Sequence, residues 1–133
     1  QNLSVLILDL DNFKNINDNF GHDIGDEFII ACANLIKAEL SETDIAARLG
    51  GEEYIVLLPN TSLKKAEDFA NKIKNSIEKL TINATDHSLI KVTASIGITC
   101  AKKDKFTFES LYKAADNALY KAKHNGRNCI VLN

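Results

Sequence analysis

The sequence lacks any apolar run long enough to cross a membrane. Its uninterrupted apolar runs, such as Val5 to Leu8 and Ile55 to Leu58, hold only a few residues, whereas a membrane-spanning helix needs about 20. No charged segment followed by an apolar one, the pattern of a signal sequence, precedes them. We therefore expect a domain that makes no membrane contact of its own.

The sequence also lacks an excess of basic residues. Its formal net charge is −2, and acidic and basic residues are interspersed along the chain. A protein that binds a nucleic acid polymer usually carries a basic excess that neutralises phosphates. A nucleic acid polymer is therefore not an expected partner.

Cysteine is scarce, and its placement excludes two kinds of site. Cys32, Cys100 and Cys129 are odd in number, widely spaced and set among apolar neighbours. They match neither a disulfide framework nor a CxxC metal site. We expect reduced, buried thiols in a cytoplasmic protein.

The composition is that of one globular domain. Hydrophobic residues make up 45% and charged residues 26% of the 133 residues, which is ordinary for a globular chain. No shift in composition marks a second domain, so we expect a single domain over residues 1–133.

The first half of the chain predicts a strand, a loop, a helix and a hairpin. Residues 3–8 are almost wholly apolar and end at Asp9, as in a strand buried on both faces. Residues 15–26 are rich in Asn, Asp and Gly and predict a loop with at most one short helical turn at its start. Residues 45–49 and 54–58 flank a Gly-Gly pair and predict a hairpin. Apolar residues at helical spacing predict the helix between loop and hairpin: Phe28, Ile29, Cys32, Leu35, Ile36 and Leu40.

The second half predicts two more helices and two main strands. One helix begins at the N-cap Ser62, and a minor strand is expected at residues 80–84. Residues 90–98 alternate apolar and polar, as in a strand with one buried face. The apolar residues of the last helix lie between Phe108 and Ala122, and a final strand follows at residues 129–132. A hairpin between helices excludes a purely parallel sheet, so we expect an α/β (α+β) fold: a mixed central sheet with helices packed on it, as in ferredoxin-like folds.

Two pairs of acids are the first candidates for chemistry. Asp9 and Asp11 lie where the first strand ends, and Glu52 and Glu53 follow the Gly-Gly turn. If the hairpin pairs beside the first strand, the two pairs meet, and their repulsion favours a cation such as Mg²⁺ between them. Alternatively, the aspartates simply end a strand and the glutamates are solvated charges at a hairpin tip. Neither a calcium EF-hand loop nor a Walker-type phosphate loop is present.

Four segments together resemble the GGDEF family of diguanylate cyclases. They are residues 9–18 (DLDNFKNIND), 21–26 (GHDIGD), 48–54 (RLGGEEY) and 116–128 (DNALYKAKHNGRN). Two features depart from the family pattern. Tyr54 stands where the family usually has Phe, and the chain begins directly at the first strand, apparently without the family's usual N-terminal helix segment.

The resemblance implies a metal site. Asp9 and Glu52, with the backbone carbonyl of Leu10, would hold Mg²⁺ (or Mn²⁺) on the triphosphate. Glu53 would be a further metal ligand or a helper in activating the 3′-hydroxyl. None of the three histidines matches a catalytic position.

The resemblance also implies two sets of GTP-binding residues. Asn17 and Asp26 match the residues that read guanine, although turn chemistry or an N-cap role for Asp26 would also explain them. Lys14, Lys123 and Arg127 match the residues that grip phosphates. Taken singly, these three cations are typical of solvated surface charge.

The activity implied by the resemblance is the condensation of two GTP molecules into cyclic dimeric GMP and two pyrophosphates. It requires a homodimer, because one site cannot close the ring alone, and a fused sensory or regulatory domain is expected. The alternatives are a non-catalytic GTP-binding GGDEF regulatory domain and a simple dimerisation module.

A feedback site is not expected. Many family members bind the cyclic product through an Arg-x-x-Asp motif ahead of the Gly-Gly pair, and Ser41-Glu42-Thr43-Asp44 stands in the matching place. Ser41 cannot supply a guanidinium fork, and Glu42 adds a repelling charge. Arg48 is expected to point to a different face, so we predict little product inhibition.

Overall fold

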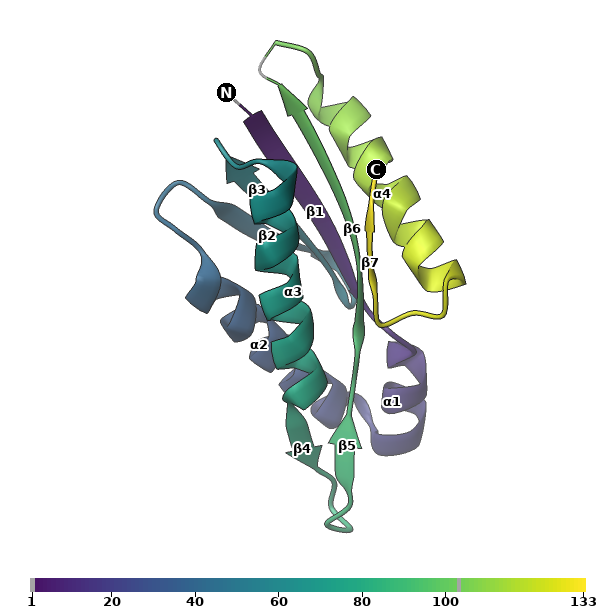
Figure 1. The fold of residues 1–133 in the computed structure, drawn as a ribbon. Coiled ribbons are helices and arrows are strands. Elements are labelled where there is room, and N and C mark those ends of the chain that lie inside the picture. Colours follow the sequence, from purple (N-terminus) through teal and green to yellow (C-terminus); the bar gives the residue numbers. More distant parts are fainter. Residues whose placement is uncertain (1, 103) are drawn as a thin grey trace.

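The structure, a computed structural model, describes residues 2–102 and 104–133 and is built on a five-stranded sheet in the order β2-β3-β1-β6-β7 (Figure 1). All neighbouring strands are antiparallel except β6 and β7, which are parallel. A separate two-stranded sheet joins β4 and β5. The elements are β1 (Asn2–Leu10), α1 (Phe13–Phe20), α2 (His22–Glu39), β2 (Ile45–Gly50), β3 (Glu53–Pro59), α3 (Leu63–Lys79), β4 (Thr81–Asn83), β5 (Leu89–Lys91), β6 (Ala94–Lys102), α4 (Phe108–His124) and β7 (Ile130–Leu132). The expected mixed sheet with helices packed on it is confirmed.

Strand β1 lies at the centre of the sheet and is buried on both faces, as its apolar run predicts. Because side chains alternate along a strand, Leu6 and Leu8 face the core under α2 and α3, whereas Val5 and Ile7 face α4. Three layers result, with the sheet between two helical layers (Figure 1). None of the helices in the described residues is long and apolar enough to cross a membrane.

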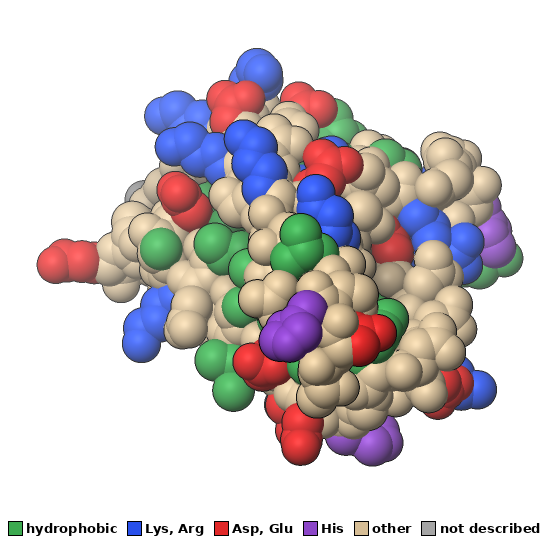
Figure 2. Space-filling view, turned by 90° about the horizontal axis from the view of Figure 1, so that it is seen from below, with side chains coloured by type: hydrophobic (Ala, Val, Ile, Leu, Met, Phe, Trp, Pro, Cys, Tyr) green, Lys and Arg blue, Asp and Glu red, His purple; other side chains and the backbone are tan. Residues whose placement is uncertain are grey.

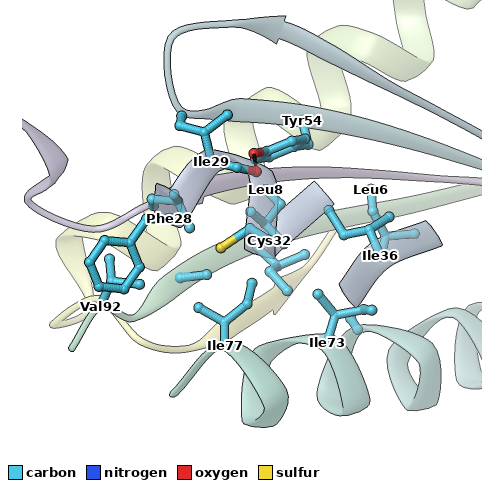
Figure 3. Packing of buried hydrophobic residues seen from close by; sticks show 14 of the residues in the cluster. Leu6, Leu8, Phe28, Ile29, Cys32, Ile36, Tyr54, Ile73, Ile77 and Val92 are labelled. Atoms are coloured by element: carbon cyan, nitrogen blue, oxygen red, sulfur yellow. Dashed lines mark hydrogen bonds between the residues drawn. The ribbon is translucent and has the colours of Figure 1, made fainter. Parts of the chain in front are cut away.

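The larger core lies under α2 and α3. Figure 3 shows Phe28, Cys32 and Ile36 of α2 facing Ile73 and Ile77 of α3 across the cluster. The helical spacing of these apolar residues explains why both helices bury one face. Cys32 is fully buried, and burial raises the pKa of its thiol to about 12. Cys100 and Cys129 are only half-buried, and all three thiols are free.

The opposite face of the sheet carries α4 in close contact. A Cβ atom added to Gly97 of β6 would overlap the backbone of Ala115 and Leu119 in α4. The missing side chain therefore lets the helix backbone approach the strand. This approach positions the α4 residues that reach the end of β1.

The predicted turn and cap features are confirmed. The hairpin of β2 and β3 turns at Gly50 and Gly51, whose φ values of 142° and 52° suit glycine. Ser62 caps α3 by accepting a hydrogen bond from the Lys65 backbone at 3.2 Å. The expected minor strand at residues 80–84 is β4.

The loop expected over residues 15–26 is wrong. Helix α1 and the start of α2 cover this segment, separated by Gly21 at φ 91°. Residues with low helix propensity form a helix here because Phe13 and Ile16, one turn apart, bury one face of α1. Asp26 lies within α2, so its N-cap interpretation is also wrong, and Gly21 occupies that position.

The single strand expected over residues 90–98 is also wrong. The segment divides into β5 and β6, and β5 pairs with β4 outside the main sheet. Strand β6 is buried on both faces at first, with Ser95 and Thr99 as buried as its apolar residues. The alternating pattern predicted one solvated face, but α4 covers that face.

The end of the molecule at which α1, β4 and β5 lie carries charges of both signs (Figure 2). Lys and Arg side chains occur on the same view as Asp, Glu and His side chains. Acidic and basic side chains are therefore mixed on this face, as they are along the sequence.

Candidate active site

The pairing of β1 with β3 brings Glu52 and Glu53, the acids of the signature segment RLGGEEY (residues 48–54), beside the first strand. Asp9 lies opposite Glu53 in the antiparallel register, and the Leu10 N–H donates to the Glu52 carbonyl at 3.2 Å. Residues about forty positions apart in the sequence therefore share one end of the sheet. The sequence made this meeting conditional on the hairpin pairing beside the first strand, and that pairing is confirmed.

Asp9 is a buried carboxylate with one satisfied oxygen. Its exposed fraction is 6%, and its Oδ2 atom accepts a hydrogen bond and ion pair from Lys123 of α4. Its Oδ1 atom is buried and has no hydrogen-bond partner among the described residues. Burial raises the pKa of Asp9, against the opposing effect of Lys123, and the charges of Glu52 and Asp11 raise it further. The carboxylate is held in a place where a second positive partner would stabilise it.

A cavity of about 170 Å³ lies at this carboxylate. Burial raises the pKa of Glu53, and the charges of Asp9 and Asp116 add to this effect. The cavity is lined by Asp9, Glu53, Asp116, Leu119, Tyr120 and Lys123.

Asp116 and Tyr120 received no role from the sequence, although a signal was present. They lie seven and three residues before Lys123, a spacing that places side chains on one face of a helix. Lys123 was a candidate, so the rest of its helix face could have been read from the same pattern.

Asp11 has a different environment from Asp9, with which the sequence grouped it. Its carboxylate accepts from the Thr93 and Ser95 hydroxyls, each at 2.7 Å, and from the Asn128 backbone N–H at 3.0 Å. Its own N–H donates to the Thr93 carbonyl at 2.8 Å. Asp11 therefore joins β1 to the start of β6 and to the segment before β7.

The candidates for guanine binding lie on α1 and α2. Asn17 is half-buried near the end of α1, and its Oδ1 atom is buried without a hydrogen-bond partner among the described residues. Asp26 is exposed on α2 and follows Gly25, against which the Asn17 side chain packs. The Asp26 carboxylate is thus open to polar groups, whereas the Asn17 oxygen is an acceptor buried against Gly25.

The phosphate candidates come from separate elements. Lys14 is exposed on α1, and Arg127 is exposed just beyond α4 with φ 63°. Lys123 pairs with Asp9, as described above. Of the predicted residues, the structure thus joins Asp9, Glu53 and Lys123 directly, and it places the remaining cations at the surface.

The donor set suits a metal ion bound together with a nucleotide. Within residues 2–102 and 104–133, no three His, Cys, Asp or Glu side chains form a metal site by themselves. Magnesium is usually held by one or two carboxylates together with substrate phosphates and water. The unpartnered Asp9 Oδ1 atom, beside Glu53 in the cavity, fits such an ion.

The signature turn is fixed from both sides. The Arg48 Nε–H donates to the Gly51 carbonyl at 2.8 Å across the turn. The Tyr54 hydroxyl donates to the Ile29 carbonyl of α2 at 2.7 Å (Figure 3). The hydroxyl that distinguishes Tyr54 from the usual Phe therefore has a buried partner, and burial raises the pKa of Tyr54 to about 12.

The segment in place of the product-binding motif is folded on itself. The Asp44 carboxylate accepts from the Ser41 backbone N–H and hydroxyl, both at 2.8 Å. Asp44 and Arg48 both line a cavity of about 470 Å³ beside α2 and β2. The face to which the Arg48 side chain points stays a prediction. The Asp44 and Arg48 side chains already make local hydrogen bonds, which would have to break for either to bind the product. Weak product binding stays a prediction.

The fold and the site together define an α/β domain with carboxylates at the end of its central strand. A family model described as "Diguanylate cyclase, GGDEF domain" matches residues 1–129. The match covers nearly the whole chain, and the chain belongs to the GGDEF family.

Curated relatives agree with this assignment. The chain is 44% identical over 132 residues to "Diguanylate cyclase A" of Treponema denticola, covering 99% of this chain and 35% of the relative. It is 39% identical over 129 residues to "Probable diguanylate cyclase DgcT" of Escherichia coli, covering 96% of this chain and 28% of the relative. The chain thus spans about a third of the length of these relatives.

Solved structures show the same fold. The diguanylate cyclase SiaD of Pseudomonas aeruginosa, in complex with its activator SiaC, has a TM-score of 0.93 at 35% identity, covering 100% of this chain and 50% of that chain. The active GGEEF domain of a diguanylate cyclase from Vibrio cholerae has a TM-score of 0.90 at 35% identity, covering 99% of this chain and 83% of that chain.

Proposed function

We propose that this domain is a diguanylate cyclase that condenses two GTP molecules into cyclic dimeric GMP and two pyrophosphates. In each half-reaction the 3′-oxygen of one GTP bonds to the α-phosphorus of the other. The bond from that phosphorus to the pyrophosphate oxygen breaks, and the hydroxyl proton is released. The observation that carries the proposal is the buried Asp9, which has one unpartnered oxygen opposite Glu53 of the signature hairpin.

Asp9, Glu52 and Glu53, with the Leu10 carbonyl, are the residues that would hold Mg²⁺ or Mn²⁺. A metal ion held by these residues would supply positive charge to the triphosphate and Lewis-acid chemistry at the attacked phosphorus. Glu53 is either a further metal ligand or a helper in activating the 3′-hydroxyl. Burial around Asp9 and Glu53 strengthens the electrostatic interactions of these groups with a charged ligand.

The chain's other polar residues bind and orient the nucleotide. Asn17 and Asp26 read guanine, the amide through the base carbonyl and the carboxylate through the N1–H and amino group. Lys14, Lys123 and Arg127 bind the phosphates. Lys123 lines the cavity at Asp9, and its ammonium group pairs with that carboxylate.

Ring closure requires two copies of the domain. Each copy binds one GTP, and a homodimer places each 3′-hydroxyl at the other copy's α-phosphate. We further propose that a sensory or regulatory domain in the parent protein controls this pairing in the cytoplasm. Support comes from the similarity to "Response regulator PleD" of Caulobacter vibrioides, at 38% identity, and to SiaD with its activator.

Incubation of the purified domain with GTP and Mg²⁺, followed by chromatographic separation of the nucleotides, tests the proposal. We expect cyclic dimeric GMP and pyrophosphate in a ratio of one to two. Bound GTP without product at high domain concentration, where dimers form, would contradict it and indicate a GTP-binding regulatory domain. Neither product nor binding would indicate a dimerisation module.

A further inference from the structure

Three successive residues turn the chain from α4 toward β7. Gly126, Arg127 and Asn128 have φ values of 102°, 63° and 48°. Positive φ is uncommon outside glycine, although asparagine tolerates it better than most residues. A residue other than glycine keeps such a conformation only where the surrounding structure stabilises it. Contacts around Arg127 and Asn128 must therefore hold this turn.

Asn128 makes the contacts that hold the turn. Its backbone N–H donates to Asp11 Oδ2 at 3.0 Å, and its side-chain Nδ2 atom donates to Glu78 Oε2 of α3 at 2.6 Å. The Lys74 Nζ atom, also of α3, donates to Asn128 Oδ1 at 3.5 Å. Asn128 thus ties the end of α4 to α3 and to the residue that follows Leu10 and Leu10's strand β1 by one position.

Glu78 serves this turn rather than the surface. It is half-buried, and Asn128 is the one hydrogen-bond partner of its side chain in the part of the chain that the structure describes. None of the ion pairs within residues 2–102 and 104–133 involves Glu78. A half-buried carboxylate without a cation is favourable only when a donor satisfies it. Glu78 therefore acts as an acceptor for Asn128.

The residue that this turn holds is Arg127. Its backbone N–H donates to the Ala122 carbonyl of α4 at 3.1 Å, so its backbone is fixed by α4 before it and by Asn128 after it. Lys123, in the last turn of the same helix, lines the cavity at Asp9 and pairs with that carboxylate. The turn thus fixes the Arg127 backbone relative to a cation of the candidate active site. A side chain on a fixed backbone loses less conformational freedom when it binds a ligand.

We propose that Glu78 and Asn128 are positioning residues for Arg127: their hydrogen bond holds the turn after α4 and thereby raises the affinity for the phosphates of GTP. This inference rests on the proposed role of Arg127 in GTP binding, and neither positioning residue needs to contact the nucleotide. A carboxylate that acted on phosphates by its charge would repel them. Removal of Glu78 therefore lowers affinity if it positions Arg127 and raises affinity if it acts by charge alone.

The test compares Glu78→Ala with Glu78→Gln. Alanine removes the acceptor, whereas glutamine removes the charge and keeps an oxygen that accepts from Asn128. Glu67→Ala is the control, because Glu67 lies on the same helix and makes no side-chain hydrogen bond within the described residues. Calorimetry with Mg²⁺ and a non-hydrolysable GTP analogue gives the affinity, and competition with guanosine, which has no phosphate, reports binding of the base and ribose.

The expected losses concern the GTP analogue alone. Glu78→Ala should lower its affinity about fivefold, the effect of one lost hydrogen bond, and leave guanosine affinity unchanged. Glu78→Gln should stay within about twofold of the wild type, and Glu67→Ala should match it. Asn128→Gly keeps the positive φ and removes the amide, so it should reproduce the loss seen in Glu78→Ala.

A double variant with Arg127→Ala separates positioning from folding. With Arg127→Ala in place, adding Glu78→Ala should change affinity for the GTP analogue less than about twofold, because no guanidinium group remains to be positioned. Unchanged or higher affinity in Glu78→Ala, an equal loss for guanosine, or a further loss in the double variant overturns the inference and leaves the proposed function standing. Unfolding of both Glu78→Ala and Asn128→Gly overturns it as well, because the contact would then serve the fold. Unchanged affinity in Arg127→Ala contradicts the proposed phosphate-binding role itself.

Discussion

Asp9 and Asp11 lie two residues apart at the end of β1, and each is 6% exposed, yet their surroundings differ. Asp11 faces β6 and the segment before β7, where two hydroxyls and a backbone N–H satisfy it. Asp9 lies opposite Glu53 of β3 and contacts Lys123, and it keeps a buried oxygen without a partner among the described residues. Burial alone therefore does not distinguish an acid whose hydrogen bonds are complete from one that keeps an unpartnered oxygen. The hydrogen-bond partners of each oxygen do.

The largest expected effect is on activity, in Asp9→Asn. The amide keeps the shape of the carboxylate but removes the charge that would hold the metal. We expect cyclic dimeric GMP synthesis to fall about 10³-fold or more, since metal ions contribute several kcal/mol to such reactions. Product formation with GTP and Mg²⁺ measures the loss, and synthesis at the wild-type rate would exclude Asp9 as a ligand.

Unfolding of Asp9→Asn provides a control that does not depend on activity. Burial raises the folded-state pKa of Asp9 above the ordinary value of 3.8, so folding favours the protonated form. In the metal-free wild type, this group's contribution to stability is therefore lost as pH rises from 3.8 through the raised value. Asp9→Asn lacks that loss, and denaturant unfolding at several pH values should show a flatter profile than in the wild type.

Asp11→Asn is the matched variant with the opposite expectation. An amide nitrogen would face at least one of the three donors that now point at the carboxylate. We expect the free energy of unfolding to fall by about 3 kcal/mol, because buried hydrogen bonds to a charged group are lost. Urea unfolding measures it, and a variant as stable as the wild type would contradict the distinction between the two aspartates.

Lys123→Met tests the partner of Asp9. Removing the ammonium group leaves a buried carboxylate unpaired, and we expect metal-free stability to fall by about 1–3 kcal/mol. This is less than the cost of breaking a fully buried pair, because the Lys123 side chain is 34% exposed. Lys64→Met is the control, since Lys64 and Asp68 form an exposed pair one helical turn apart, and its Tm should scarcely change. A fall no larger than the control's would mean that the Asp9 pair contributes nothing to folding.

Asp26 is exposed, and its side chain makes no hydrogen bond within residues 2–102 and 104–133. Asp26→Ala tests whether this carboxylate binds the base. We expect little change in stability and a loss of GTP affinity equivalent to about 1–3 kcal/mol, because the guanine donors lose their acceptor. ATP affinity should be unaffected. Titration calorimetry with both nucleotides measures the difference, and equal losses would show that Asp26 does not read the base.

The smallest effect concerns Tyr54→Phe, which restores the usual family residue. Losing the hydrogen bond to Ile29 should lower stability by about 0.5–1.5 kcal/mol at pH 7. Because burial raises the Tyr54 pKa to about 12, folding favours the neutral phenol, and this contribution is lost as pH rises from 10 toward 12. The difference between wild type and variant should therefore shrink over that range in unfolding experiments. A difference that stays constant would contradict the assigned role of the hydroxyl.

Much of the site was predictable because its chemistry lies in short segments. The acids after the first strand and after the Gly-Gly turn, and the cations of α1 and α4, stand in contiguous motifs. The hairpin and the apolar faces of α2, α3 and α4 follow from local periodicity. The failures have one kind of cause. Helix α1 and the two-sided burial of β6 depend on what packs against them.

The sequence by itself determined the family, the candidate residues and the mixed sheet, because these depend on residue types at fixed local spacings. Only the tertiary structure decided which of the two aspartates keeps a buried oxygen without a partner among the described residues. The partners of Asp11 lie 82, 84 and 117 residues away, and Lys123 lies 114 residues from Asp9. Such pairings arise when strands and helices from distant parts of the chain pack together, so no local pattern specifies them. The same packing places Asn17 against Gly25 across the turn at Gly21, in a segment whose composition predicted only a loop.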